Sequence, residues 1–528
     1  MDTKTLFLGD EAVAQGAMDA GISGVYAYPG TPSTEIMEYV QAAPEAGARG
    51  VHRQWSANEK TAMEEALGMS YAGKRALVCM KHVGLNVAAD AFINSAITGV
   101  NGGLVVVAAD DPSMHSSQNE QDSRFYGKFA AVPVCEPCSQ QEAYDMVRAA
   151  FDFSEKIRLP VLLRITTRLA HSRADVVPAP ARAENPLNPS SDPRQWVLLP
   201  AHARRNWAAL LARMPEITAL GDAFPWNRFI PGTNRQMGIL AAGIAFNYLN
   251  ECFPGGTCPF PILKLGQYPL SSARLATLQA ACDSLLILED GAPFIEEQLV
   301  GLFPNPVMPI RGRLDGTLPR TGELTPENVA AALGRARPEG PAVPPLVTPR
   351  PPALCRGCPH SDTYAFLKEV MSDFPAGRVF SDIGCYTLGA LPPYEAIHSC
   401  VDMGASITMA KGASDAGVRP AIAVIGDSTF AHSGITGLLD AVAESSPVKL
   451  LILDNEITGM TGGQESLAFG RLESIAAGIG VDPAHIRVVT PLAKHHAENV
   501  RILREEIAWP GVSVIIARRA CIQMRRKG

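Results

Sequence analysis

The chain has 528 residues, enough for about three domains of ordinary size. Hydrophobic residues make up 47% and charged residues 19%, as in a globular protein, and the net charge is −7. That charge, without a long basic run, argues against nucleic acid as a partner and against a polybasic membrane contact. We find no apolar stretch of the ~18 residues that cross a bilayer, and no basic start of a secretory signal. We therefore expect a cytoplasmic protein whose 11 cysteines stay reduced.

Strand-like and helix-like segments alternate over residues 1–190. The apolar runs RALVCM, GLVVVAA and PVLLRIT are typical of buried strands, and DEAVAQGAMDAG and NEKTAMEEALGMSYAG of the helices between them. This βαβ pattern predicts an α/β domain with a parallel sheet. Pro, Ala, Asn and Arg then accumulate from about 172 to 200 and predict a linker.

Two further α/β segments follow. Residues 200–338 contain the strand-turn-helix pattern QMGILAAGIAFNYLNE and the strands ILKLGQYPL and SLLILED. A proline-rich run over 337–352 predicts a stiff spacer. Residues 353–528 end in the strand GVSVIIARR. The fold class is therefore α/β, with three doubly wound domains at 1–190, 200–338 and 353–528.

The third segment carries the most informative pattern. A buried strand ends at Gly426-Asp427-Ser428, and 28 residues after Asp427 comes Asn455, at the end of the next strand. A strand that ends in glycine and opens a helix directs backbone N–H groups at an anion such as a diphosphate. Asp427 and Asn455 offer the hard oxygen ligands that Mg²⁺ prefers. With the glycine-rich stretch 458–464 behind it, this spacing resembles the signature of thiamine-diphosphate enzymes.

Activation of thiamine diphosphate requires a carboxyl group beside its aminopyrimidine ring. The candidate is Glu59, at the head of a predicted helix and nine residues before Gly68. A first-turn glutamate often only complements the helix dipole, and Glu64 and Glu65 are interpreted as such solvated or outer-face residues. Because the third segment predicts the cofactor independently, we assign Glu59 the catalytic role.

Two loops that follow predicted strands suit a substrate. In YPGTPSTE, the backbone N–H groups and the hydroxyls of Thr31 and Ser33 suit a carboxylate, although Ser33 equally suits a helix N-cap. In MKHVGLN, Lys81 and His82 suit an oxyanion or a 2-oxo group. His432, just after GDSTFA, is a further candidate for the same cleft.

Four cysteines of the third segment have the order of a metal or cluster site. Cys355 and Cys358 form a CxxC pair, Cys385 follows a strand, and Cys521 closes the last strand. Thiolates suit either zinc or a four-iron cluster, and both remain open. Cys400 competes with Cys521 for the fourth position. A cluster would also explain why these residues lie near a cofactor that yields electrons.

These blocks together resemble the α subunits of indolepyruvate ferredoxin oxidoreductases, in the 2-oxoacid:ferredoxin oxidoreductase superfamily. The resemblance runs from LGDEAVAQG through YPGTPSTE, SANEK, KHVGLNVAAD, LCRGCPH, DIGCYTLG and GDSTFAHSGI to DNEITGMTGGQ, nearly the whole chain. It implies a pyrimidine-binding domain at 1–190, a transketolase C-terminal-like domain at 200–338 and a diphosphate-binding domain at 353–528. It also implies oxidative decarboxylation of aryl 2-oxoacids such as indolepyruvate and phenylpyruvate to acyl-CoA.

The resemblance implies cofactors and partners as well. Thiamine diphosphate would bind with Mg²⁺, and CoA would be the co-substrate. The partners would be a smaller β- or γ-type subunit, an electron acceptor (ferredoxin or a cluster-bearing subunit) and a second copy in a dimeric core. The implied Mg²⁺ ligands are Asp427, Asn455 and the carbonyl of Ile457, and the implied [4Fe-4S] ligands are Cys355, Cys358, Cys385 and Cys521. The implied cofactor-binding residues are Glu59, Gly426, Asp427, Ser428, Asn455, Ile457, Thr458, Gly459 and Thr461.

One difference from the family bears on electron transfer. Its members usually carry a C-terminal ferredoxin-like module with eight clustered cysteines, whereas this sequence stops soon after Cys521. We therefore expect electrons to leave through a separate or fused partner. The alternative is a non-oxidative thiamine-diphosphate decarboxylase or ligase on the same scaffold. A non-catalytic assembly partner is a third interpretation, which the presence of Glu59, Asp427 and Asn455 disfavours.

Overall fold

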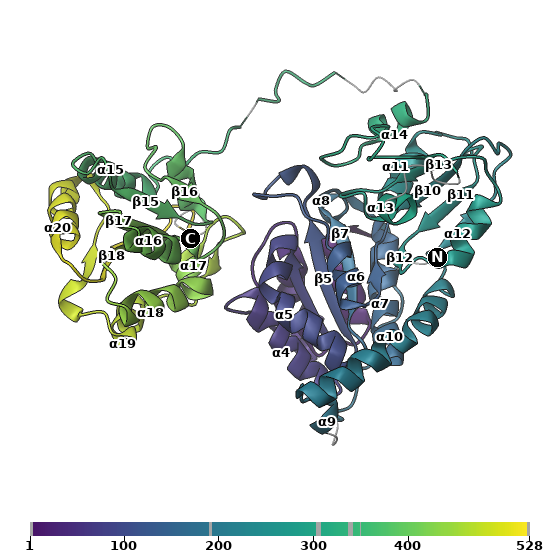
Figure 1. Ribbon diagram of the computed structural model, residues 1–528, viewed down its shortest axis with the longest axis horizontal. Coiled ribbons are helices and arrows are strands. Elements are labelled where there is room, and N and C mark those ends of the chain that lie inside the picture. The colour runs from purple at the N-terminus through teal and green to yellow at the C-terminus, as the bar shows by residue number, and fades with distance from the viewer. Residues whose placement is uncertain (1–3, 190–192, 302–307, 336–341, 349, 525–528) are drawn as a thin grey trace. The chain divides into compact units, whose positions relative to one another are not determined.

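The computed structural model describes residues 4–189, 193–301, 308–335, 342–348 and 350–524. The chain divides into two compact units, residues 1–341 and 342–528, drawn in purple to teal and in green to yellow in Figure 1. The expected spacer at 337–352 spans this division, and its residues 337–341 and 349 lie outside the described part. No described helix is long and apolar enough to cross a membrane.

A seven-stranded sheet forms the centre of the first unit, in the order β12-β6-β7-β5-β4-β2-β3. All its pairings are parallel except that of β12 with β6. Its strands are β2 (Gly24–Ala27), β3 (His52–Trp55), β4 (Ala76–Lys81), β5 (Leu104–Asp110), β6 (Val134–Cys135), β7 (Val161–Thr166) and β12 (Gln267–Tyr268). The helices between them are α1 (Gly9–Asp19), α2 (Thr34–Ala42), α3 (Pro44–Ala48), α4 (Glu59–Tyr71), α5 (His82–Thr98), α6 (Arg124–Ala130), α7 (Gln140–Ile157) and α8 (Thr167–His171). The prediction of a parallel sheet here is confirmed.

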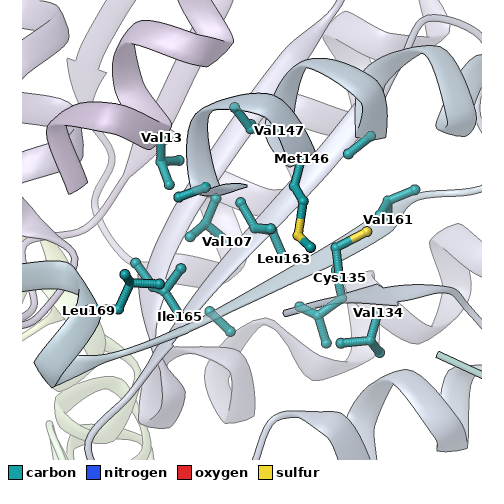
Figure 2. Packing of buried hydrophobic residues seen from close by; sticks show 14 of the residues in the cluster. Val13, Val107, Val134, Cys135, Met146, Val147, Val161, Leu163, Ile165 and Leu169 are labelled. Atoms are coloured by element: carbon teal, nitrogen blue, oxygen red, sulfur yellow. The ribbon is translucent and has the colours of Figure 1, made fainter. Parts of the chain in front are cut away.

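The central strands of this sheet are largely apolar because both of its faces are covered. Every residue of β5 and of β7 is buried. Figure 2 shows Met146 and Val147 of α7 over Leu163 of β7, with Val107 of β5 beside them. Such continuous apolar strands are characteristic of parallel sheets buried on two sides.

A second sheet in the same unit has the order β14-β13-β10-β11-β9. Its strands are β9 (Arg228–Ile230), β10 (Gly238–Ala242), β11 (Ile262–Leu265), β13 (Leu285–Leu288) and β14 (Ile310–Arg311), and only β9 is antiparallel to its neighbour. The accompanying helices are α10 (Pro200–Asp222), α11 (Ala245–Glu251), α12 (Ser272–Gln279), α13 (Phe294–Val300) and α14 (Pro326–Ala332). The predicted strand-turn-helix in 200–338 is present as β10 and α11.

Buried charges join the two sheets of the first unit. Arg124, which is fully buried, donates from Nη1 to Glu289 Oε2 at 2.9 Å. Arg164, also fully buried, donates from Nη2 to the carbonyl oxygen of Asp290 at 2.9 Å. Since β12 also pairs with β6, residues 200–338 supply both a strand and ionic partners to the first sheet. This explains why one compact unit contains both sheets.

The expectation of a linker over 172–200 is wrong for its described residues. Strand β8 (Arg173–Val176) pairs antiparallel with β1 (Thr5–Leu8). The backbone N–H groups of Arg182 and Asn188 donate to carbonyl oxygens at the ends of α1 and α4, at 2.9 and 2.8 Å. A short helix, α9 (Pro193–Trp196), follows. The Pro-rich composition is that of a linker, but backbone hydrogen bonds hold the segment against the first sheet.

The second unit contains a six-stranded, wholly parallel sheet in the order β16-β15-β17-β18-β22-β21. Alternate residues of β17 face opposite ways: Ala423 and Ile425 join one apolar core, and Ile422 and Val424 join another. Helices therefore cover both faces, as expected for a doubly wound domain. The strands are β15 (Arg378–Ser381), β16 (Ser399–Cys400), β17 (Ala421–Gly426), β18 (Val448–Asp454), β21 (Ile486–Val489) and β22 (Ser513–Arg518). The longer helices are α15 (Pro359–Met371), α16 (Ala405–Asp415), α18 (Ile435–Ala443), α19 (Leu472–Ile479) and α20 (His496–Ala508).

Candidate active site

The predicted diphosphate residues meet at one edge of the sheet in the second unit. Strands β17 and β18 are parallel neighbours, with Gly426 opposite Leu453. Asp427 and Asn455 come directly after these strands, and both are buried, at 1% and 6% exposure. The carboxyl edge of a parallel sheet is where α/β proteins bind ligands.

Three oxygen-bearing groups converge there. The side-chain amide of Asn455 lies 3.0 Å from Asp427 Oδ1 and 3.0 Å from the carbonyl oxygen of Ile457. With its nitrogen toward them, the amide donates to both. With its oxygen toward them, three oxygens face one another, an arrangement that either a cation or a proton on Asp427 would stabilise. Asp427 Oδ2 is buried and accepts no hydrogen bond from a described residue.

The turn that brings these groups together has a left-handed residue. Glu456, between Asn455 and Ile457, has φ of +72°. A non-glycine residue in this region costs of order 1–3 kcal/mol and is found where the surrounding structure requires it. The short strand β19 (Ile457–Thr458) then pairs with β20 (Gln464–Glu465). The left-handed turn allows the Asn455 side chain and the Ile457 carbonyl to point to one place.

The environment of Asp427 opposes its ionisation when no cation is present. Burial raises its pKa to about 7, and the negative charge of Asp454 adds to the rise. Asp454 is itself buried and pairs with Arg518 at 2.6 Å. A divalent cation beside Asp427 would reverse this penalty, because opposite charge favours the carboxylate.

Tyr386 packs against the glycine that precedes Asp427. A Cβ atom on Gly426 would come within 2.6 Å of Tyr386 Cε1, so a larger residue does not fit. The hydroxyl of Tyr386 donates to Asp382 Oδ1, and the hydroxyl of Thr429 donates to the carbonyl of Ile383 at 3.1 Å. The turn after β15 is thereby tied to the start of the Asp427 segment. Asp382 and Tyr386 were not predicted as site residues, although they lie in the quoted block DIGCYTLG.

The glycine-rich stretch after β19 lies against the same edge. Thr458 Oγ1 donates to the hydroxyl of Ser428 at 2.9 Å. A Cβ atom on Gly459 would lie 3.3 Å from Cys385 Sγ and 3.8 Å from Asn455 Nδ2. Gly459 thus lies between Cys385 and the oxygen group, the name used below for Asp427, Asn455 and the Ile457 carbonyl. Thr461 instead donates to Gln464 Oε1 at 2.8 Å, within the hairpin turn.

The four predicted cysteines gather beside this edge. Burial raises the pKa of Cys385 to about 12, and the charges of Cys358, Cys521 and Cys355 add to it. The backbone N–H of Cys358 donates to the carbonyl of Cys355 at 2.9 Å, and that of Cys521 to the carbonyl of Asn455 at 3.1 Å. This hydrogen bond holds the backbone of Cys521 next to that of Asn455, a member of the oxygen group.

The spacing and the neighbours of the thiols bear on two open questions. A tetrahedral zinc site with bonds of about 2.3 Å needs sulfurs about 3.8 Å apart. In the described part of the chain, no three of these sulfurs lie within 4.8 Å of one another. The charged neighbours of Cys400 are Asp382 and Asp402, whereas Cys521 is among the neighbours of Cys385. Cys521, and not Cys400, is thus among the residues whose charge acts on Cys385.

In the first unit, Glu59 begins α4 as predicted. The N-cap residue Asn58 accepts from Thr61 N at 2.8 Å, which fixes the start of the helix. Glu59 is 6% exposed, and a Cβ atom on Gly84 would come within 2.7 Å of Glu59 Oε1. The carboxylate therefore lies against the first turn of α5, where only a glycine leaves room.

The other two glutamates of α4 have local partners. Glu64 forms an exposed ion pair with Lys60. Glu65 accepts from the hydroxyl of Ser56 at 2.7 Å. Glu59 is thus the buried carboxylate in this helix.

Lys81 and His82 lie where β4 ends and α5 begins. The Lys81 ammonium donates to the carbonyl of Ser116 at 2.8 Å, and burial lowers its pKa to about 8. His82 is 1% exposed, and burial lowers its pKa. One ring nitrogen lies 3.2 Å from Asn119 Oδ1, and Nδ1 has no partner among the described residues. Sequence reasoning did not identify Asn119, because its loop has no motif.

The loop that contains Thr31 lies beside Lys81. A Cβ atom on Gly30 would lie 3.3 Å from Lys81 Cβ. The Ser33 hydroxyl donates to the carbonyl of Gly30 at 2.7 Å and makes no capping bond to α2, although Ser33 is the N-cap residue. Thr31, partly exposed, is thus the better placed of the two for a substrate. Glu59, Thr31, Lys81 and His82 all belong to the first unit.

His432 lies in the second unit, in a short π-helical turn (Phe430–Gly434) after α17 (Asp427–Thr429). It is 4% exposed, and its Nδ1 lies 2.5 Å from the Ser433 hydroxyl. Single π-helical turns inside helices are frequent at functional sites.

Comparison with known proteins identifies the family. Residues 15–215 match the model of the thiamine diphosphate-binding region of pyruvate flavodoxin/ferredoxin oxidoreductase, and residues 382–508 match the C-terminal TPP-binding domain of thiamine pyrophosphate enzymes. Indolepyruvate oxidoreductase subunit IorA of Archaeoglobus fulgidus is 38% identical over 98% of this chain and 86% of its own. IorA of Pyrococcus abyssi is 38% identical over 99% and 87%.

The chain belongs to the IorA family. It is therefore a thiamine-diphosphate enzyme of the 2-oxoacid oxidoreductase type, and the resemblance seen in the sequence is confirmed. The 2-oxoglutarate:ferredoxin oxidoreductase of Magnetococcus marinus has the same kind of fold, with a TM-score of 0.50 at 16% identity over 63% of this chain and 65% of that one.

The two matched regions contain the two groups of site residues. Glu59, Lys81 and His82 fall in residues 15–215, and Asp427 and Asn455 fall in residues 382–508. Each unit thus contains some of the predicted site residues.

Proposed function

We propose that this chain is the catalytic subunit of an oxidoreductase that oxidatively decarboxylates aryl 2-oxoacids, of the indolepyruvate and phenylpyruvate type, to acyl-CoA. Electrons would pass through a [4Fe-4S] cluster to ferredoxin or a cluster-bearing partner. One observation supports the proposal: the Asp427 carboxylate, the Asn455 side-chain amide and the Ile457 carbonyl converge, and Gly459 lies between them and Cys385. The proposed cation site and the four cysteines would therefore lie at the same edge of the sheet in the second unit.

The oxygen group suits Mg²⁺. At the usual Mg–O distance of about 2.1 Å, adjacent ligands of an octahedron are about 3.0 Å apart. The Asn455 amide lies 3.0 Å from each of the other two atoms. Asp427, Asn455 and the Ile457 carbonyl would hold the ion on one side, and oxygens of the diphosphate would complete its coordination. The backbone after Gly426, with Ser428, Thr458, Gly459 and Thr461, would line the diphosphate.

The first-unit residues would act on the ring and the substrate. Thiamine diphosphate, when bound, supplies the carbon centre and electron sink for decarboxylation. Glu59 would hold and move a proton at the aminopyrimidine ring, in a site shielded from water by its burial. Lys81 and Thr31 would bind the substrate carboxylate. His82, and His432 of the second unit, would donate hydrogen bonds to oxygen atoms at the reacting centre.

The cysteines would hold the cluster. Cys355, Cys358, Cys385 and Cys521 are four thiols, the number that a [4Fe-4S] cluster requires. Because each thiolate binds a separate iron, a cluster accepts sulfurs farther apart than a single zinc ion does, in agreement with the spacing here. A smaller β- or γ-type subunit, CoA as acyl acceptor and a dimeric core complete the proposal.

The test is analysis of the purified chain, co-expressed with the smaller subunit. We expect about four iron atoms and one thiamine diphosphate per chain. We also expect CoA-dependent oxidation of indolepyruvate or phenylpyruvate with an artificial electron acceptor. Glu59→Gln abolishes turnover, while its helix neighbour Glu64→Gln serves as a matched control and retains it. Full cofactor occupancy with no iron, and aldehyde release without acceptor, would instead show a non-oxidative decarboxylase.

A further inference from the structure

A second group of potential ligands lies in the first unit, apart from the proposed catalytic residues. Asp10, Glu35 and His171 each place one ligand atom within 4.8 Å of the others. They come from three elements, α1, α2 and α8. Among the described residues, no other group of three or more His, Cys, Asp or Glu side chains is so closely spaced.

Asp10 is the central member of this group. It is fully buried, and neither of its carboxylate oxygens accepts a hydrogen bond from a described residue. Glu35 Oε2 is likewise buried and without a partner. Burial raises the pKa of Asp10 well above its usual value, and the charge of Glu35 adds to the rise. An uncompensated buried carboxylate costs several kcal/mol, so such an arrangement calls for a counter-charge or a proton.

The backbone around Asp10 is closely packed. A Cβ atom on Gly9 would come within 2.2 Å of the Leu169 carbonyl oxygen, and Gly9 N donates to the Ser172 carbonyl at 3.2 Å. The start of α1 is thereby fixed against α8, which ends at His171. The side chains of Glu35 and His171 are each 34% exposed and lie 3.5 Å apart. The group is thus pre-arranged on its buried side and open to water on the other.

We propose that Asp10, Glu35 and His171 bind one divalent transition-metal ion. Two carboxylates balance its charge, and a mixed oxygen and imidazole set suits Mn²⁺, Fe²⁺ or Zn²⁺. Water completes the coordination on the exposed side. The ion fixes the first turn of α2, which follows the loop that contains Thr31. This inference does not rest on the proposed function, since none of its three ligands takes part in it.

The competing chemistry is a proton shared between the carboxyl groups of Asp10 and Glu35. Such a pair needs no metal, and its stability depends on pH alone. The variant Asp10→Asn distinguishes the two chemistries, because the amide keeps the shape and the hydrogen-bond donor of a protonated carboxyl group but supplies no negative charge to balance a divalent cation.

Mn²⁺ is the probe, because it binds carboxylate and imidazole in preference to thiolates. Free Mn²⁺ is counted by electron paramagnetic resonance as it is added to the full-length protein without thiamine diphosphate. We expect Asp10→Asn and His171→Gln each to lose about one bound Mn²⁺ per chain. Asp427→Asn, at the other cation site, and His115→Gln, at an exposed histidine, should retain this ion. Equal Mn²⁺ binding by the wild type and both ligand variants would overturn the proposal.

Thermal unfolding gives a second readout. Mn²⁺ should raise the melting temperature of the wild type relative to chelator, by mass action on the native state, and raise that of Asp10→Asn by less. A wild-type melting temperature that depends on pH but not on Mn²⁺ would also overturn it, in favour of the shared proton.

Discussion

The ring of Tyr386 lies against the backbone of Gly426, where a Cβ atom would meet Tyr386 Cε1 at 2.6 Å. Gly426 has φ of −80°, so the backbone conformation itself does not demand glycine. Glycine is required here because Tyr386 packs closely against this backbone. The residue before Asp427 must be small because Tyr386 covers it.

Gly426→Ala should therefore displace Tyr386 or the Asp427 turn. Overpacking of this kind costs about 1–3 kcal/mol. We expect weaker thiamine diphosphate binding, by at least about tenfold, measured by titration calorimetry. Gly412→Ala is the matched control, since a Cβ atom there meets nothing within 4 Å. Unchanged cofactor affinity in Gly426→Ala would show that this contact does not position the diphosphate loop.

The Asp427 carboxyl predicts a pH dependence of cofactor binding. In the metal-free protein its pKa is raised to about 7, so a proton competes with Mg²⁺ below that pH. Mg²⁺-dependent binding of thiamine diphosphate should weaken about tenfold per pH unit as pH falls below about 7. A binding constant that stays flat from neutral to acidic pH would contradict this.

The same group affects stability with the opposite sign. Between its ordinary pKa of 3.8 and about 7, Asp427 binds more protons in the native metal-free state than in the unfolded state. The free energy of unfolding should therefore fall as pH rises through this range. Asp427→Asn should remove that slope, as measured by denaturant unfolding with chelator present.

Lys81 predicts how substrate affinity depends on alkaline pH. Burial lowers its pKa to about 8, so the ammonium loses its charge above that pH. The KM for the 2-oxoacid should rise above about pH 8 in the wild type and stay level in Lys81→Arg, which keeps the charge. Lys81→Met should raise KM at all pH values, by at least about tenfold. Lys128→Met, at an exposed lysine, is the control. An equal rise of KM in that variant would contradict a role of Lys81 in binding the substrate.

The cysteine geometry predicts a difference between two variants. Cys521 is held by the Asn455 carbonyl and is a neighbour of Cys385, whereas Cys400 is near Asp382 and Asp402. Cys521→Ala should lose most of its iron and its visible absorption. Cys400→Ala should keep both. If Cys400→Ala lost its iron and Cys521→Ala kept it, Cys400 would be the fourth cluster ligand in place of Cys521.

Much of the site was predictable because it follows strands. The carboxyl ends of β17 and β18 are adjacent in any parallel sheet that pairs them, so Asp427 and Asn455 had to meet. The same logic placed Lys81 at the carboxyl end of β4. The strands and the CxxC pair could be recognised from sequence patterns without knowledge of the tertiary structure.

Other features were not visible in the sequence. Tyr386 packs against Gly426 and donates to Asp382, and both contacts depend on how a turn packs. Asn119 reaches His82 from an irregular loop. The proline-rich segment near residue 180 was misread because composition reports flexibility only on average, whereas specific hydrogen bonds, such as that from Arg182 to Asp19, fix the chain.

The edge strand β12 has a consequence for how this protein unfolds. Residues 267–268 complete a sheet whose other strands come from 24–166, and Glu289 neutralises Arg124 inside it. A fragment ending near residue 190 would keep Asp122 as a partner of that arginine, but it would lose Glu289 and leave β6 without its neighbour β12. Residues 4–335 should therefore melt in a single calorimetric transition.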